Sequence, residues 1–364
     1  MATIRLENLR HSYATNPASD ADWALKRIDL TWDDGGAYAL LGPSGCGKTT
    51  LLNLISGLLR PTEGRIRFGE RDVTDAPPDA RNIAQVFQFP VVYDTMTVYD
   101  NLAFPLRNRG MPEREIAPRV AALAEMLDLG AMLGRRASGL TADGKQKISL
   151  GRGLVRPDVN VVMFDEPLTV IDPHLKWTLR SKLKELHQRV RSTMIYVTHD
   201  QTEAMTFADR VVVMHDGTVV QSGTPVELFE RPHHTFVGHF IGSPGMNVLP
   251  CTLDGDVAVV FGERLALART TVAAGGASTE VGVRPEFVRL ADRGMAARVV
   301  RISDAGRHRI VETVVGRVDG GGAGDSARVR LLIDEALPVP AGEVRLAFDP
   351  AHTHLYVDSW LAGA

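Results

Sequence analysis

The chain has 364 residues, 44% of them hydrophobic, and its 41 basic and 44 acidic side chains leave a formal net charge of −3. That length predicts two domains, each with enough apolar content for its own core. The near-neutral charge provides no long-range field for nucleic acid, so no nucleic-acid partner is expected. The two cysteines, Cys46 and Cys251, are too few for a disulfide framework and are typical of a reducing cytoplasm.

The sequence predicts neither a signal peptide nor a membrane-spanning helix. Its first ten residues, MATIRLENLR, carry a charge every few positions, unlike the apolar core of a signal peptide. No run approaches the ~18 apolar residues that a spanning helix needs. Any membrane role is therefore expected to be peripheral.

Up to about residue 235, strand-like runs alternate with helix-like segments. The runs AYALL (37–41), VNVVMF (159–164) and TMIYVTH (193–199) are short and uninterrupted, as expected of strands covered on both faces. This order predicts an α/β domain over residues 1–235, with a largely parallel sheet and helices on both of its faces.

A helical segment is expected to be inserted in this domain at about residues 95–157. Apolar residues recur there at helical spacing, at Ile116, Val120, Leu123 and Leu127. Gly130 follows as a helix stop signal. Over residues 236–364 the segments become short and alternating, which predicts a small β-barrel, and the glycine-rich run 319–326 predicts a loop within it.

The stretch GPSGCGKT matches the phosphate-binding pattern GxxxxGK[ST] in full, between an expected strand and the helical run TTLLNLISGLL. In this pattern glycines let backbone N–H groups surround phosphates, and the helix N-terminus adds its positive end. Lys48 is expected to reach the terminal phosphates of ATP, and the Thr49 hydroxyl to ligate Mg²⁺. The predicted nucleotide-binding residues here are Gly42, Pro43, Ser44, Gly45, Cys46, Gly47, Lys48, Thr49 and Thr50.

The stretch VVMFDEP supplies acidic groups at the end of a second expected strand. Asp165 is positioned to hold the Mg²⁺ shell, and Glu166 to polarise the attacking water. Together with the phosphate-binding loop, this pair predicts ATP hydrolysis.

These motifs, with four further residues, resemble the ATP-binding cassette (ABC) family over nearly the whole of the first 240 residues. The resemblance implies that Tyr13 stacks on adenine and that His199, in IYVTHD, bonds the γ-phosphate as part of the catalytic site. It also implies that Gln88, in VFQFP, joins the Mg²⁺ site to the groove where a membrane subunit docks, and that Asp172 reaches across a dimer interface.

Two later stretches resemble one branch of that family, the ATPases of carbohydrate importers such as the maltose and glycerol-phosphate systems. They are FIGSPGMNVL (240–249) and VGVRPEFVRL (281–290). The resemblance implies that residues 236–364 form an oligonucleotide-binding-type (OB-type) barrel used for dimer contacts and regulation. It further implies a peripheral location on the cytoplasmic face of the membrane. The implied partners are two integral membrane subunits, docking near residues 88–105, and an extracytoplasmic solute-binding protein.

The stretch GLTADGKQKISLGR differs from the family signature, which is normally Leu-Ser-Gly-Gly-Gln and closes over ATP bound to the opposite subunit. The aligned residues are Leu140, Thr141, Ala142, Asp143 and Gly144. At ~5 Å and an effective dielectric constant of ~20, a carboxylate facing one phosphate charge costs roughly 3 kcal/mol. This predicts a heterodimer with a different ATPase chain whose signature is intact. The alternative is that Asp143 is an ordinary helix cap favoured by the helix dipole.

The resulting hypothesis is an ATPase subunit of a carbohydrate or polyol importer, with a glycerol-like solute plausible. One alternative is a non-transport ABC protein of translation or repair, although such proteins usually have two cassettes or a long coiled-coil insertion. Another is a regulatory nucleotide sensor that does not turn over.

Overall fold

The computed structural model describes residues 3–190, 192–268, 278–316 and 326–363, in two compact units that meet in the sequence at Pro225 and Val226. The boundary expected near residue 235 falls within the second unit. Residues 319–325 of the glycine-rich run lie outside the described residues.

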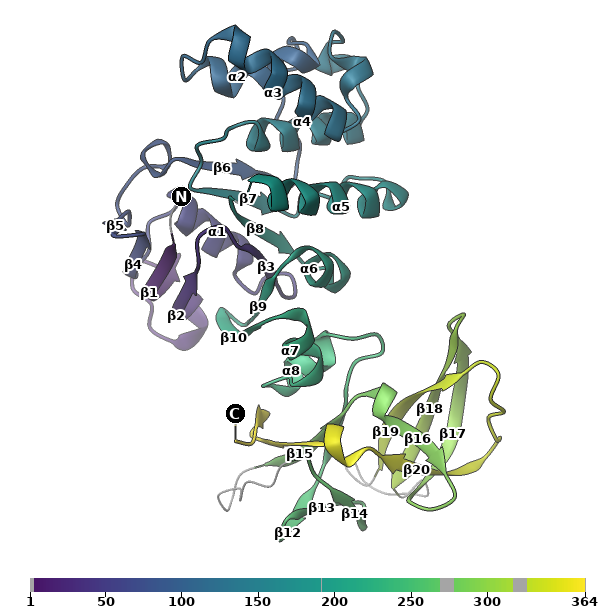
Figure 1. Ribbon diagram of the computed structural model, residues 1–364. Helices are drawn as coiled ribbons and strands as arrows, with labels where there is room; N and C mark the ends of the chain where they lie inside the picture. Colours follow the sequence, from purple (N-terminus) through teal and green to yellow (C-terminus); the bar gives the residue numbers. More distant parts are fainter. Residues whose placement is uncertain (1–2, 191, 269–277, 317–325, 364) are drawn as a thin grey trace. The chain divides into compact units, whose positions relative to one another are not determined.

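A six-stranded sheet forms the centre of the first unit (Figure 1). Its order is β10-β9-β3-β8-β7-β6, and all neighbouring pairs are parallel except β9 and β10. The bounds are β3 Ala37–Leu41, β6 Ile83–Val86, β7 Val161–Asp165, β8 Thr193–Thr198, β9 Arg210–His215 and β10 Thr218–Gly223. The three strands expected from the sequence are confirmed as β3, β7 and β8. Because these strands are parallel, the loops that follow them meet at one edge of the sheet.

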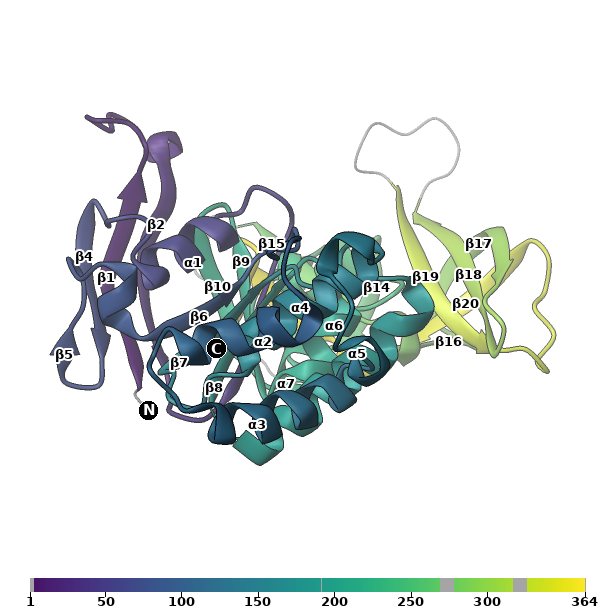
Figure 2. The same cartoon turned by 90° about the horizontal axis from the view of Figure 1, so that it is seen from above.

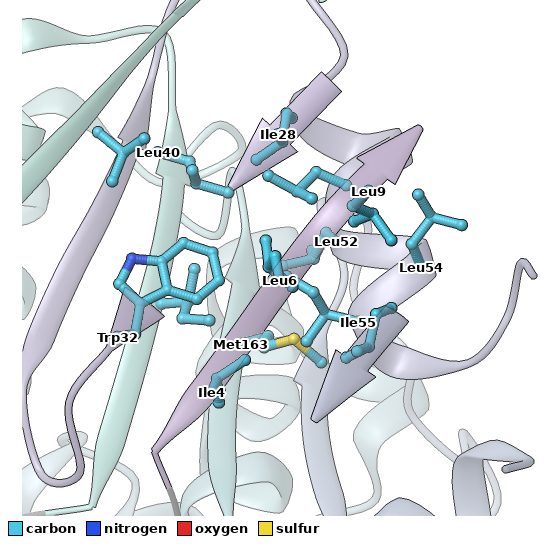
Figure 3. Close-up of a cluster of buried hydrophobic side chains, with 14 of the residues drawn as sticks. Ile4, Leu6, Leu9, Ile28, Trp32, Leu40, Leu52, Leu54, Ile55 and Met163 are labelled. Atoms are coloured by element: carbon cyan, nitrogen blue, oxygen red, sulfur yellow. The ribbon is translucent and has the colours of Figure 1, made fainter. Parts of the chain in front are cut away.

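A second, antiparallel sheet was not predicted from the sequence. Its order is β2-β1-β4-β5, formed by β1 Ile4–Ser12, β2 Trp23–Trp32, β4 Glu63–Phe68 and β5 Arg71–Asp72. Figure 3 shows Ile4 and Leu6 of β1, Leu52 of α1 (Lys48–Ser56) and Met163 of β7 in one buried cluster. The helix that follows the phosphate-binding loop is therefore packed into a core shared by both sheets.

The buried guanidinium of Arg81 caps the other end of α1. It ends the 3₁₀ turn Pro78–Arg81, is 1% exposed, and its Nη1 donates to the carbonyl oxygens of Leu54 and Ile55, each at 2.8 Å. A cation at a helix C-terminus offsets the negative end of the helix dipole. Arg81 thus stabilises the helix whose opposite end faces the phosphate-binding loop.

The inserted helical segment contains α2 Val98–Arg107, α3 Glu113–Met126 and α4 Ala142–Leu154, which lie together in Figure 1. The predicted apolar face is confirmed, since Ile116, Val120, Leu123 and Leu127 are all buried. The predicted stop at Gly130 is wrong. The helix ends earlier, where Asp128 adopts φ 58°, and Gly130 instead begins the 3₁₀ turn Gly130–Met132. The aspartate tolerates this left-handed conformation, and its carboxylate accepts from Lys182 at 2.7 Å.

Two more helices complete the first unit, α5 Pro173–Val190 and α6 Gln201–Phe207. The remaining 3₁₀ turns of this unit are Asp20–Asp22 and Ala137–Gly139. In the described part of the chain, no helix combines the length and the apolar character needed to cross a membrane.

The second unit consists of antiparallel sheets preceded by the short helices α7 Pro225–Glu230 and α8 Thr235–Phe240. The largest sheet, partly visible in Figure 2, has the order β16-β20-β17-β18-β19. Its strands are β16 Val288–Ala291, β17 Met295–Asp304, β18 His308–Gly316, β19 Ser326–Asp334 and β20 Glu343–Phe348. The others are β11 Asn247–Pro250, β12 Thr252–Asp254, β13 Val257–Val260, β14 Glu263–Ala266, β15 Thr279–Val283, β21 His354–Val357 and β22 Trp360–Leu361. The second unit also contains two 3₁₀ turns, Pro285–Phe287 and Pro350–His352.

Arg284, in the stretch VGVRPEFVRL, connects the short helices to the sheets. It is 3% exposed, and its Nη1 donates to the carbonyls of Gly238 and Ile241, at 3.4 and 2.5 Å. The guanidinium stacks on Phe229 at 4.0 Å, and burial lowers the pKa of Arg284 to about 10. Backbone carbonyls thus compensate a buried cation at the ends of α7 and α8.

Candidate nucleotide-binding site

The loop between β3 and α1 requires glycine at several positions. Gly45 and Gly47 adopt φ 83° and 99°, a region that favours glycine. At Gly42 a Cβ atom would lie 2.3 Å from the carbonyl oxygen of Met214. Pro43 and Ser44 complete the turn, with Ser44 exposed at its tip. The loop therefore brings backbone N–H groups to the start of α1, as phosphate binding needs.

Lys48 lies inside this loop and is 5% exposed. Its Nζ donates to the carbonyl oxygens of Gly42 and Pro43 at 2.8 and 2.9 Å. The buried thiol of Cys46 lies 3.9 Å from the same Nζ, and burial raises the pKa of Cys46. The loop thus holds the ammonium group where terminal phosphates are expected, while Cys46 remains a neutral packing group.

Thr49, in the first turn of α1, and Asp165, at the carboxyl end of β7, are the predicted Mg²⁺ ligands. The Thr49 hydroxyl donates to Asp165 Oδ1 at 3.4 Å. Burial, and then the neighbouring charge of Glu166, raise the pKa of Asp165. A hydroxyl and a carboxylate whose ionisation is disfavoured fit a hard divalent cation, because the cation would stabilise the charged form.

The described residues contain no cluster of three or more His, Cys, Asp or Glu side chains able to hold a metal ion. A site with few protein ligands is typical of Mg²⁺, which usually binds through one or two carboxylates plus phosphates and water. Gln88 is half-buried in the loop after β6. Because β6 pairs in parallel with β7, with Val86 opposite Phe164, this loop lies at the same sheet edge as Asp165.

Glu166 and His199 meet at this edge. Glu166 Oε1 lies 3.1 Å from His199 Nδ1, and Glu166 Oε2 accepts from the Thr169 hydroxyl at 3.4 Å. Glu166 adopts φ 46°, while its N–H donates to Val197 of β8 at 3.0 Å. The carboxylate is thus oriented from two sides. Thr169 was not predicted, because a hydroxyl three residues after an acidic pair carries no distinctive sequence signal.

Tyr13 is 66% exposed, and its hydroxyl lies 3.1 Å from Thr50 Oγ1 in the first turn of α1. The imidazole of His11 meets the tyrosine ring edge-on, with centroids 4.8 Å apart. The ring therefore lies beside the phosphate-binding helix with a surface available for a base to stack on.

The altered signature lies at the start of α4. Thr141 is the N-cap and accepts from the Gly144 N–H at 3.3 Å, so the idea that Asp143 itself caps the helix is wrong. Asp143 Oδ2 instead lies 3.6 Å from Lys147 Nζ, with 27% of the aspartate side chain exposed. The predicted repulsion between Asp143 and a partner's phosphate did not take this ion pair into account. The i, i+4 spacing that brings the two charges together was readable in the sequence.

The remaining signature positions differ in exposure. Ala142 is exposed at the start of α4, whereas Gly144 is buried beside Leu140. Asp172 is exposed before α5, where its carboxylate accepts from the His174 N–H at 2.9 Å. These positions describe one chain only, so the contacts of these residues with a partner subunit remain predictions.

A largely parallel sheet with a phosphate-binding loop, a carboxylate pair and a histidine at one edge defines a P-loop nucleoside triphosphatase. The family model described as ABC transporter matches residues 25–169. The chain is 40% identical over 321 residues to the sn-glycerol-3-phosphate import ATP-binding protein UgpC of Bordetella bronchiseptica, covering 87% of each. It is 38% identical to the protein of that name from Yersinia pestis, covering 98% of this chain and 97% of the other. The chain belongs to the ABC transporter family and is an ABC-type ATPase.

Two solved structures resemble it. CbiO1 of Clostridium perfringens, part of the transporter complex cbiONQ, has a TM-score of 0.56 and 28% identity, covering 63% of this chain and 90% of that one. The ATP-binding cassette MJ0796, in a post-hydrolysis state with ADP and Pi, has a TM-score of 0.54 and 25% identity, covering 61% and 98%.

Proposed function

We propose that this chain is the ATP-hydrolysing subunit of an importer for glycerol-3-phosphate or a related polar solute. The observation that carries the proposal is the convergence of Lys48, Thr49, Asp165, Glu166 and His199 at one sheet edge. The solute class is supported by the names of the relatives that match nearly the whole chain.

In this proposal each residue has a separate task. Lys48 and the loop N–H groups hold the phosphates, and Tyr13 stacks on the base. Thr49, Asp165 and Gln88 hold Mg²⁺, which when bound neutralises charge on the β- and γ-phosphates. Glu166 accepts a proton from the attacking water, while His199 orients the γ-phosphate and Glu166.

The proposed partners are two integral membrane subunits and an extracytoplasmic solute-binding protein, with this chain peripheral on the cytoplasmic face. The segment before α2 supports a docking surface in the range 88–105. Three of its apolar side chains are exposed, by 69%, 51% and 41%, namely Phe89, Val91 and Tyr93. Exposed apolar clusters of this kind mark contact sites.

Residues 236–364 are proposed to be an OB-type barrel for regulation and dimer contacts. The support is their short antiparallel strands, most of which share a core that includes Val281, Val311 and Leu331.

The chain is further proposed to act with a second ATPase chain. The pairing of Asp143 with Lys147 makes a second copy of this chain a sufficient partner, because the anion at the signature is compensated. The alternative partner is a different ATPase chain. This alternative is favoured because Ala142 and Asp143 occupy positions where the family signature has glycines.

Reconstitution tests the function. Vesicles containing the chain, its membrane subunits and the solute-binding protein should take up labelled glycerol-3-phosphate only with ATP inside, and Glu166→Gln should stop uptake. Uptake of another polyol instead of glycerol-3-phosphate would change the assigned solute but would still support an importer ATPase. ATP turnover without uptake, by a chain that does not co-purify with integral membrane proteins, would favour a non-transport ABC ATPase, and ATP binding without turnover would favour a nucleotide sensor.

A further inference from the structure

Gln146 is a fully buried polar residue on α4, two positions after the signature segment 140–144. Its side-chain Nε2 donates to the carbonyl oxygen of Pro167 at 2.8 Å and to that of Phe87 at 3.4 Å. A primary amide has two N–H donors, so both carbonyls can be served by one nitrogen. One side chain thus joins three segments that are distant in the sequence.

Both acceptors adjoin residues of the proposed site. Phe87 precedes Gln88, and Pro167 follows Glu166. The other amide atom, Gln146 Oε1, is buried without a hydrogen-bond partner among the described residues. A flipped amide would point that oxygen at two carbonyls, so the contacts fix the orientation of the side chain.

Further contacts join α4 to the segment after Gln88. Ser149 Oγ accepts from the Val91 N–H at 3.4 Å, and Arg152 Nη1 donates to the Val91 carbonyl at 2.7 Å. Lys145 Nζ lies 2.7 Å from Asp94 Oδ1. A movement of α4 therefore displaces the Gln88 segment with it, and Gln146 extends the connection to the loop after β7.

The loop after β7 has a conformation that its surroundings must maintain. Glu166 adopts φ 46°, which a residue with a side chain rarely takes up unless neighbouring contacts hold it. Thr169 supplies one such contact, since its hydroxyl donates to the Glu166 carbonyl at 3.0 Å. The bond from Gln146 to the Pro167 carbonyl supplies another, from the signature helix.

We propose that Gln146 is a positioning residue that transmits the placement of the signature helix to Glu166 and Gln88. The proposal rests on the proposed roles of those two residues. It deepens that function, because the helix that contacts a partner's ATP is joined through one amide to the loops that serve this chain's own ATP. Gln146 touches neither nucleotide nor water in this scheme.

The test compares Gln146→Met and Gln146→Glu with the wild-type full chain. Gln146→Met keeps the length of the side chain but removes both donors. We expect it to bind ATP within about twofold of wild type while kcat falls about tenfold, the usual scale for residues that orient a catalytic group. Backbone hydrogen exchange should increase at 87–91 and 165–171 and remain unchanged in α1.

Gln146→Glu adds a pH readout that loss of packing does not produce. When ionised, its carboxylate faces two carbonyls, whereas the protonated acid can donate to one of them. We expect kcat relative to wild type to rise about fivefold or more between pH 8 and pH 6, because burial raises the pKa of a carboxyl group. Gln188→Met, on the exposed side of α5, is the matched control and should change none of these quantities.

Unchanged exchange at 165–171 in Gln146→Met, or a parallel loss of ATP affinity and kcat, would overturn the proposal. If that variant fails to fold, a pH-independent kcat ratio for Gln146→Glu would overturn it instead. Full turnover in Glu166→Gln would refute the underlying site assignment and not the coupling. The hydrogen-exchange comparison decides the coupling independently of turnover.

Discussion

Glu166 Oε1 lies 3.1 Å from His199 Nδ1, so the proposed base and the proposed γ-phosphate sensor are in direct contact. The histidine side chain is 56% exposed and the glutamate 20%. The contact joins the end of β7 to the end of β8, which are neighbouring parallel strands. The carboxylate is therefore oriented by contacts within this chain, and its removal can be separated from nucleotide binding.

Glu166→Gln should leave ATP affinity within about twofold while turnover falls by a factor on the order of 10²–10⁴, the scale of general base catalysis. The amide keeps the size of the side chain and can still contact Thr169, but it cannot take a proton. Titration with a fluorescent ATP analogue and steady-state phosphate release measure the two quantities. Glu185→Gln, at an exposed position of α5, is the control, and turnover above a tenth of wild type in Glu166→Gln would show that another group is the base.

Lys48→Ala should weaken ATP binding by more than about a hundredfold, because it removes a charge-assisted contact to the phosphates and leaves two loop carbonyls without their donor. ATP should then no longer raise the thermal unfolding midpoint. Lys184→Ala, which removes a half-buried lysine of α5 whose Nζ donates to the Thr206 carbonyl, should bind ATP as wild type does. Retained binding in Lys48→Ala would place the phosphates elsewhere.

Asp165 provides a pH-dependent prediction. Folding raises the pKa of this carboxyl group by burial and by the charge of Glu166. Between its ordinary pKa and the raised value, the folded chain binds more protons than the unfolded chain, so stability falls as the pH rises through that window. Above the raised pKa the unfavourable ionisation is fully present.

Asp165→Asn should therefore stabilise the nucleotide-free chain at pH values above the raised pKa, and this gain should disappear below the ordinary pKa of the aspartate. The same variant should bind Mg²⁺ with ATP more weakly, because a neutral amide replaces the charged ligand. Denaturant unfolding across pH, with and without Mg²⁺ and ATP, measures both effects. A variant less stable than wild type above the raised pKa would contradict the assigned cause of the pKa shift.

The residues that sequence reasoning located best are those whose role is set by local backbone. Gly45 and Gly47 need left-handed conformations inside a loop of fixed pattern, and that pattern also positions Lys48. Gln146 is different, because its two acceptors lie 59 and 21 residues away and become neighbours only through the packing of α4 on the sheet edge. Contacts between residues so far apart in the sequence produce no regular spacing that sequence analysis could detect. The antiparallel sheet of β1 and β4 depends on a similarly distant pairing, with Ile4 opposite Phe68.

Arg284→Met should lower the stability of the second unit by about 2–4 kcal/mol, since several backbone carbonyls at the ends of α7 and α8 would lose their buried donor. Arg289→Met, at an exposed position of β16, is the matched control and should cost little. Calorimetry of both variants measures the difference. ATP affinity should not change, because the contacts of Arg284 lie within the second unit. Equal unfolding midpoints for Arg284→Met and Arg289→Met would show that the buried cation is not needed for stability.

The last prediction concerns Asp143 and Lys147, whose charged groups are 3.6 Å apart at the start of α4. Lys147→Met should leave the carboxylate uncompensated where a partner's phosphate is expected. At ~5 Å and an effective dielectric constant of ~20, the restored repulsion is roughly 3 kcal/mol, which corresponds to about a hundredfold. Turnover of the chain alone should therefore fall steeply in Lys147→Met, whereas Asp143→Gly should have a smaller effect.

The double variant Asp143→Gly with Lys147→Met separates charge from packing. If the lysine acts by compensating the aspartate, removing both charges should restore most of the lost turnover, because no anion then faces the phosphate. If the lysine acts through packing alone, the double variant should be as slow as Lys147→Met. Turnover per chain is measured with the chain alone and with a second, different ATPase chain added. If the wild-type chain alone has full activity, two copies of this chain are sufficient to form the ATPase pair. If activity appears only when the second ATPase chain is added, the heterodimer is supported instead. In that case, compensation of Asp143 by Lys147 is not sufficient to make the signature competent.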